Sequence, residues 1–157
     1  MIPAGARRLA VAGIGNTLAG DDGAGIRALE MLESLLGDAS PPGVRLVRIE
    51  GDLLDVTDLI GEVDHIVFLD AVAASPPGTL IESVSARRAF APSFHQTDIG
   101  TLMARLEPLG LTEAFPTWEI RGIAIDPPAV LGEGLSPAVE EAVVRLAGSL
   151  AREIMAR

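Results

Sequence analysis

Short apolar runs alternate along this chain with segments whose apolar residues recur at helical spacing, and this alternation limits the possible folds most strongly. Continuous apolar runs at 9–14 and 65–70 are typical of strands buried on both faces of a sheet. Helical spacing predicts a helix over 24–36 and a last helix that ends at about Met155. Strands that alternate with helices favour a parallel sheet between helical layers. We therefore expect an α/β fold, a single-domain three-layer sandwich over residues 1–157 with a twisted, mostly parallel sheet covered by helices on both faces.

Weaker patterns complete the expected order of elements. Ser136 followed by Pro137 is typical of an N-cap and a first helical residue, so the last helix is expected to begin there. Gly110 is suited to the end of the helix before it. The other expected elements are strands at 44–49, 79–84 and 118–125, a short helix at 52–60 and a helix at 98–109.

The composition excludes several kinds of chemistry and of partner. The chain has 157 residues, of which 22 are acidic and 12 basic, and its formal charge of −10 argues against nucleic acid as a partner. All the basic residues are Arg, and a chain without Lys or Cys has no thiol nucleophile, disulfide or Lys Schiff base. No window reaches about 18 apolar residues, and the segment before the first strand is too short for a signal peptide. We expect no membrane association and a cytoplasmic location.

A loop rich in Gly, Asn and Asp follows the first predicted strand, at the edge where open α/β sheets bind ligands. Gly13 and Gly15 could begin a dinucleotide-binding fingerprint, but that fingerprint needs a third Gly where this chain has Leu18. A tight turn is enough to explain the two glycines. Either Asp21 or Asp22 could be the N-cap of the following helix, which leaves the other acid unexplained.

A further acidic residue, Asp70, ends the predicted strand 65–70. Adjacent strands lie about 4.8 Å apart, so Asp22 and Asp70 would face one crevice if their strands are neighbours. The third candidate, His95, lies in a predicted loop, whereas His65 begins its strand at the end opposite Asp70 and is expected to be structural. Two carboxylates and an imidazole form a plausible set of ligands for a divalent metal. The alternatives are that the acids are caps and that His95 is a solvated side chain.

Several motifs occur in order along the chain. Residues 13–25 read Gly-x-Gly-Asn-x-Leu-x-x-Asp-Asp-Gly-x-Gly directly after the first strand. An apolar strand ending in Asp70-Ala71 follows, and then a segment with His95 between Phe and Gln. Residues 122–127 and 134–139 add a last strand, a loop and the start of the last helix. Together these motifs, which cover nearly the whole chain, resemble the nickel-iron hydrogenase maturation endopeptidases.

The resemblance implies an α/β sandwich that removes a short C-terminal extension from a hydrogenase large-subunit precursor. In that family the nickel already inserted in the precursor is the recognition signal. The resemblance therefore implies nickel supplied by the substrate. Because two carboxylates and one imidazole form an incomplete shell, we expect no tightly bound cofactor, and cadmium or zinc as occupants of the site in vitro. The precursor is the expected partner, and the chain is expected to be a monomer.

The resemblance also assigns residues by position. Asp22, Asp70 and His95 are the implied catalytic residues and metal ligands, and Asp21 is a candidate for orienting Asp22 or accepting a proton, unless it is only a cap. The residues implied to shape the loop are Gly13, Gly15, Asn16 and Gly23.

More than one mechanism and function stays open at this stage. A metal held by the three ligands would polarise the scissile carbonyl or activate a water molecule, one carboxylate would instead act as a general base, or Asp22 and Asp70 would form an aspartic-protease dyad. The family often has Gly-Gly-Thr after its second strand, where this chain has Glu50-Gly51-Asp52. This departure also fits a non-cleaving paralogue that docks on the precursor or binds metal. A nucleotide-binding module is the remaining alternative.

Overall fold

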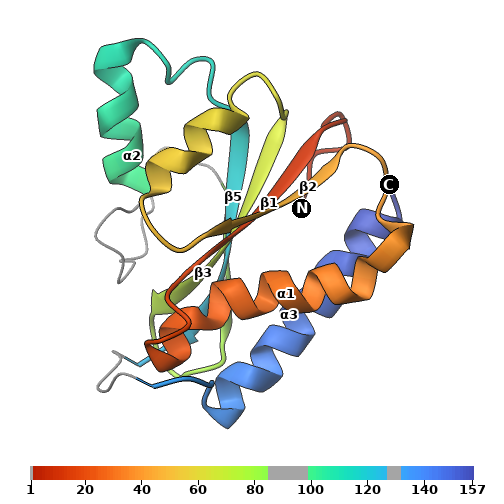
Figure 1. Ribbon diagram of the computed structural model, residues 1–157, viewed down its shortest axis with the longest axis vertical. Coiled ribbons are helices and arrows are strands. Elements are labelled where there is room, and N and C mark those ends of the chain that lie inside the picture. Colours follow the sequence, from red (N-terminus) through yellow and green to blue (C-terminus); the bar gives the residue numbers. More distant parts are fainter. Residues whose placement is uncertain (1, 85–98, 127–131) are drawn as a thin grey trace.

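A computed structural model describes residues 2–84, 99–126 and 132–157. Within them, a five-stranded sheet has the order β2-β1-β3-β5-β4. Neighbouring strands are parallel except β4 and β5, which are antiparallel, so the predicted mostly parallel α/β sheet is confirmed (Figure 1). The strands are β1 (Leu9–Ile14), β2 (Val44–Ile49), β3 (His65–Ala73), β4 (Leu80–Val84) and β5 (Thr117–Ile125).

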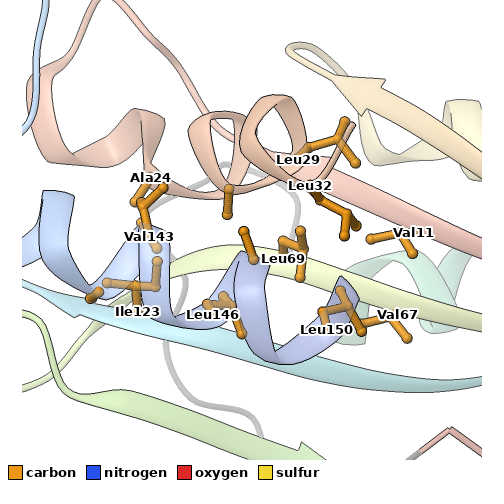
Figure 2. Packing of buried hydrophobic residues seen from close by; sticks show 14 of the residues in the cluster. Val11, Ala24, Leu29, Leu32, Val67, Leu69, Ile123, Val143, Leu146 and Leu150 are labelled. Carbon is orange, nitrogen blue, oxygen red and sulfur yellow. The ribbon is translucent and has the colours of Figure 1, made fainter. Parts of the chain in front are cut away.

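Two helices, α1 (Ala24–Leu36) and α3 (Pro137–Met155), lie side by side on one face of the sheet (Figure 1). Their apolar positions pack against every second residue of the central strands, including Val11, Val67 and Leu69 (Figure 2). The helical spacing predicted these buried positions correctly, since all of the following are buried: Ile26, Leu29, Leu32, Leu36, Val139, Val143, Leu146, Leu150 and Ile154.

The other face of the sheet is covered by the 3-10 helix η3 (Leu53–Leu59) and by α2 (Ile99–Leu106) (Figure 1). The alternate strand residues, such as Phe68, form a second apolar cluster with these elements. Phe68 meets Trp118 edge to face, with ring centroids 6.3 Å apart. The expected three layers are therefore present. Short 3-10 helices complete the described elements: η1 (Gly20–Gly23), η2 (Gly37–Ala39) and η4 (Glu107–Leu109).

The structure corrects three of the expected elements. The third strand does not end at Asp70, because its pairing with β5 continues as far as Ala73 and Ile125. The short helix expected at 52–60 is a 3-10 helix. The helix expected to reach residue 109 ends at Leu106 and continues as η4, since Pro108 has no N–H to donate to an α-helical hydrogen bond.

The long helix α3 is amphipathic. Its buried residues face α1 and the sheet, whereas Glu140, Glu141 and Arg145 are exposed. Among the described residues, no helix is both long enough and apolar enough to cross a membrane.

Candidate active site

Asp70 lies within β3, next to the end of β1. Leu69 pairs with Gly13 of β1, and Asp70 itself pairs with Gly122 of β5. Because side chains alternate along a strand, Asp70 projects from the same face as Phe68. Only 8% of Asp70 is exposed. Asp70 therefore stands in a continuous strand at the position where the neighbouring strand stops.

Asp22 lies in η1, the turn that joins β1 to α1. The turn contacts β3, and 7% of Asp22 is exposed. β1 and β3 are neighbours in the sheet, which is the condition on which the expected common crevice depended. The two nearly buried carboxylates are thus carried by adjoining segments at the carboxyl edge of the parallel strands.

Glycine allows the loop to fold closely around Asp22. A β-carbon on Gly15 would lie 2.5 Å from the carbonyl oxygen of Asp22, and a β-carbon on Gly23 would lie 2.9 Å from the α-carbon of Thr17. The Asn16 N–H donates to the carbonyl oxygen of Asp22 over 3.3 Å. The Asn16 side chain accepts a hydrogen bond, 3.0 Å long, from the N–H two residues later. Contacts within the loop therefore explain why Gly15, Asn16 and Gly23 occupy these positions.

The start of α1 also depends on close backbone contacts. A β-carbon on Gly13 would lie 2.8 Å from the carbonyl oxygen of Gly25. The N-cap of α1 is Gly23, and no side chain caps this helix end. The interpretation that Asp21 or Asp22 caps the helix is therefore wrong, because both acids lie within η1 and Gly23 stands between them and the first α-helical residue.

The carboxylate of Asp21 binds a residue far away in the sequence. Its Oδ1 accepts a hydrogen bond from the N–H of Ser136 (2.6 Å), and its Oδ2 accepts one from the Oγ of the same residue (2.8 Å). Ser136 is the N-cap residue of α3, as predicted, but its hydroxyl makes no capping bond to that helix. The Ser-Pro pair marked the helix start, and nothing in the sequence linked Ser136 to Asp21. The expected role of Asp21 behind Asp22 stays a prediction.

Glu50-Gly51-Asp52, which stands where the family often has Gly-Gly-Thr, lies beside the glycine loop at the end of β2. The carbonyl oxygen of Ile49 accepts a hydrogen bond from Gly15 (3.3 Å). Glu50 pairs with Arg48 at 2.6 Å, and this hydrogen bond lowers the pKa of Glu50. Asp52 caps η3 by accepting a hydrogen bond, 3.0 Å long, from the N–H of Leu54. Both acids thus have local structural roles.

The two histidines are related differently to this edge. His95 lies outside the described residues; α2, which begins soon after it in the sequence, packs on the face from which Asp70 projects. His65 is at the opposite end of β3, as predicted, with its Nδ1 2.8 Å from the Oγ1 of Thr117. Burial lowers the pKa of His65. Across 2–84, 99–126 and 132–157, no three His, Cys, Asp or Glu side chains form a group that could hold a metal ion.

The arrangement is suited to acid–base or metal chemistry. Carboxylates are seldom as deeply buried as Asp22 and Asp70, so two of them at one edge of a sheet mark that edge as a candidate site. Carboxylate oxygens are hard ligands that suit divalent metals. The carboxyl ends of parallel strands are also where open α/β sheets bind their ligands. Asp22 and Asp70 are carboxylates, they are nearly buried, and they lie at this edge of the sheet.

Comparison with known proteins gives a clear result only for solved structures. No protein-family model and no curated protein matches the chain. The NiFe hydrogenase maturation protease HycI from Thermococcus kodakarensis KOD1 is 25% identical, with a TM-score of 0.71 over 98% of this chain and 96% of that one. A hydrogenase 2 maturation peptidase from Thaumarchaeota archaeon SCGC_AB-539-E09 is 26% identical, with a TM-score of 0.61 over 94% and 97%.

A third structure extends the likeness in fold. HybD, a NiFe hydrogenase maturation protease from Thermococcus kodakarensis, is 21% identical, with a TM-score of 0.74 over 94% of this chain and 99% of that one. The alignments leave little of either partner uncovered, so the likeness is to whole proteins and not to a shared fragment. Together with the fold and the ordered motifs, the two structures at 25% and 26% identity support membership of this chain in the family of the NiFe hydrogenase maturation proteases.

Proposed function

We propose that this protein is an endopeptidase that removes a short C-terminal extension from the large-subunit precursor of a NiFe hydrogenase. The observation that carries the proposal is the pair of nearly buried carboxylates, Asp22 and Asp70, at the carboxyl edge of a sheet with the fold of maturation proteases. The absence of Cys and Lys from the sequence removes thiol and Lys-dependent mechanisms. Carboxylate chemistry is the best supported of those that remain.

In this proposal the nickel ion belongs to the substrate. Asp22 and Asp70 supply oxygen ligands, and His95 supplies an imidazole. Three ligands leave coordination positions for the groups with which the precursor already holds its nickel. The protein therefore distinguishes a nickel-loaded precursor from an empty one without a resident cofactor. Cadmium and zinc are the expected stand-ins in vitro.

Hydrolysis requires a group that moves one proton. A carboxylate at the scissile bond accepts a proton from the attacking water while the water oxygen bonds to the carbonyl carbon. The same proton is then delivered to the leaving nitrogen as the C–N bond breaks. Asp22 and Asp70 are the candidates for this role, either singly or as an aspartic-protease pair that shares a proton.

The expected partner is the precursor alone. With a formal charge of −10, the protein attracts a basic C-terminal extension, and opposite charge speeds the encounter of two proteins. The monomeric state and the cytoplasmic location are parts of this proposal.

Intact-mass spectrometry of the hydrogenase precursor tests the proposal. The nickel-loaded and nickel-free forms are each incubated with and without the protein. The proposal predicts the loss of a short C-terminal peptide from the nickel-loaded form alone. Equal cleavage of both forms contradicts the role of nickel. A stable complex with an unchanged precursor mass contradicts the peptidase and supports the non-cleaving paralogue.

A further inference from the structure

The turn that carries Asp22 is attached to the start of α3 by several hydrogen bonds. Asp21 accepts two from Ser136, at 2.6 and 2.8 Å. Two backbone hydrogen bonds add to these. The N–H of Gly20 donates to the carbonyl of Gly132 (2.7 Å), and the N–H of Gly132 donates to the carbonyl of Leu18 (2.9 Å). We call this set of four bonds the η1–α3 clamp. It joins segments that are more than a hundred residues apart in the sequence.

Ser136 does not behave as an ordinary N-cap. The side chain of a Ser at this position usually accepts a hydrogen bond from an N–H in the first turn of its own helix. Here the Ser136 hydroxyl makes no such bond and donates to Asp21 instead. Hydrogen bonds to an ionised carboxylate are shorter and stronger than those between neutral groups. The contact therefore restrains the turn at the expense of the ordinary cap.

The turn that carries Asp22 is held differently on its two sides. On its C-terminal side the turn continues into α1, which is packed into the apolar core. On its N-terminal side η1 has no side-chain cap, and the clamp is what joins it to α3. The helix α3 is itself held by buried residues, among them Val139 and Val143. Without the clamp, the N-terminal side of the turn would keep only local bonds, such as that from the Asn16 N–H to the Asp22 carbonyl, while both helices stay in place.

We infer that Ser136 is a positioning residue, which fixes the Asp22 carboxylate through Asp21 and the η1–α3 clamp. This inference rests on the proposed peptidase function. Misplacement of a reacting group by about 1 Å costs about a hundredfold in rate, so a loosened turn acts mainly on kcat. Asp22 is also a proposed ligand of the substrate's nickel, so KM is expected to rise as well, but by less than kcat falls, because the substrate contacts outside the turn are unchanged.

The test compares three variants in the precursor cleavage assay. Ser136→Ala removes the hydroxyl donor and keeps the N–H donor, and we expect kcat to fall at least tenfold while KM rises by a smaller factor. Ser136→Thr keeps both donors, and the exposed site has room for the extra methyl group, so at least half of kcat is expected to return. Ile154→Val is the control, because it removes one methyl group from the buried face at the other end of α3. It tests whether a loss of stability alone lowers kcat.

Two further measurements separate positioning from a general loss of structure. Hydrogen exchange of the peptide that contains Gly20 is expected to be faster in Ser136→Ala than in the wild type and unchanged in Ile154→Val. The affinity for cadmium, measured by calorimetry, is expected to fall in Ser136→Ala and to be kept in Ser136→Thr. The double variant of Asp21→Asn and Ser136→Ala should lose little more than either single variant, because the two residues act as one unit.

The outcomes distinguish this inference from the proposed function. Cleavage by the wild type with an unchanged kcat in Ser136→Ala overturns the positioning role and leaves the peptidase intact. An equal loss of kcat in Ile154→Val assigns the effect to stability and also overturns the positioning role. A wild type that does not cleave overturns the proposed function. The cadmium affinities then test the positioning role of Ser136. Equal affinities in the wild type and Ser136→Ala, or no binding by either, overturn that role too.

Discussion

A β-carbon on Gly25 would lie 2.3 Å from the carbonyl oxygen of Leu69, so α1 begins in direct contact with β3. The same β-carbon would lie 2.3 Å from the carbonyl oxygen of Ile14, at the end of β1. The helix start therefore sits over the end of β1 and over the neighbouring part of β3, which continues to Ala73. This contact brings the turn that precedes α1 to the residue after Leu69, which is Asp70. Glycine at position 25 is thus part of how the fold places Asp22 and Asp70 on adjoining segments.

Replacement of Gly25 by Ala is expected to destabilise the protein strongly. Backbone oxygens on both strands block the new methyl group, and neither can move without breaking the sheet. We expect a loss of about 3 kcal/mol or more in the free energy of unfolding, measured with urea. Gly5→Ala is the control, because a β-carbon there meets nothing within 4 Å. Equal stabilities of Gly25→Ala and Gly5→Ala would contradict the close contact.

The carboxylate of Asp64 is expected to make stability depend on pH in acid. It accepts hydrogen bonds from the N–H groups of Arg7 and Arg8 and from the Arg8 guanidinium. The Arg8 side chain is the main cause of a pKa lowered from 3.8 to about 2. A carboxyl group with a lowered pKa in the folded state stabilises the protein above its ordinary pKa, and this contribution is lost as the pH falls through the folded value.

Asp64→Asn should therefore melt at a lower temperature than the wild type at pH 7. The difference should narrow between about pH 4 and about pH 2 and close below that range. Differential scanning calorimetry across this range measures it, with the exposed residue Asp58, changed to Asn, as the control. A difference in melting temperature that stays constant from pH 7 to pH 2 would show that ionisation of Asp64 is not its origin.

Cadmium is expected to stabilise the wild type more than Asp70→Asn. A ligand that binds only the folded state at 100 times its Kd adds about 2.7 kcal/mol, which corresponds to a rise of several degrees in the melting temperature of a chain of this length. Loss of one of the proposed ligands weakens binding and reduces the rise. Thermal melts with and without cadmium test this, and equal rises in both proteins would argue against Asp70 as a ligand.

The sequence predicted the apolar elements well because their patterns are local. The strands at 9–14 and 44–49 and the helix at 24–36 have the predicted bounds, and the last helix begins at Pro137. Helical spacing and continuous apolar runs are properties of a few neighbouring residues, and burial follows from them directly. The same local patterns placed Asp22 in the loop that follows the first strand.

Local patterns could not predict the contacts between segments that are far apart in the sequence. The predicted strand 65–70 is too short, because residues 71–73 also belong to β3, where β5 extends beside them. The position of β5 between β3 and the antiparallel β4 follows from the sheet as a whole and from no single segment. The bonds from Ser136 to Asp21 form only when α3 packs beside α1. The sequence could therefore suggest a site near Asp22 and Asp70 without showing what holds it in place.

The most direct test of the account compares the wild type with Asp22→Asn and Asp70→Asn on the same nickel-loaded precursor, by intact mass. Each change keeps the shape of the side chain and removes its charge, so we expect melting temperatures within a few degrees of the wild type. The account predicts that the wild type releases the C-terminal peptide and that both variants leave the precursor mass unchanged. Full cleavage by either folded variant would contradict the claim that these two buried carboxylates carry the reaction.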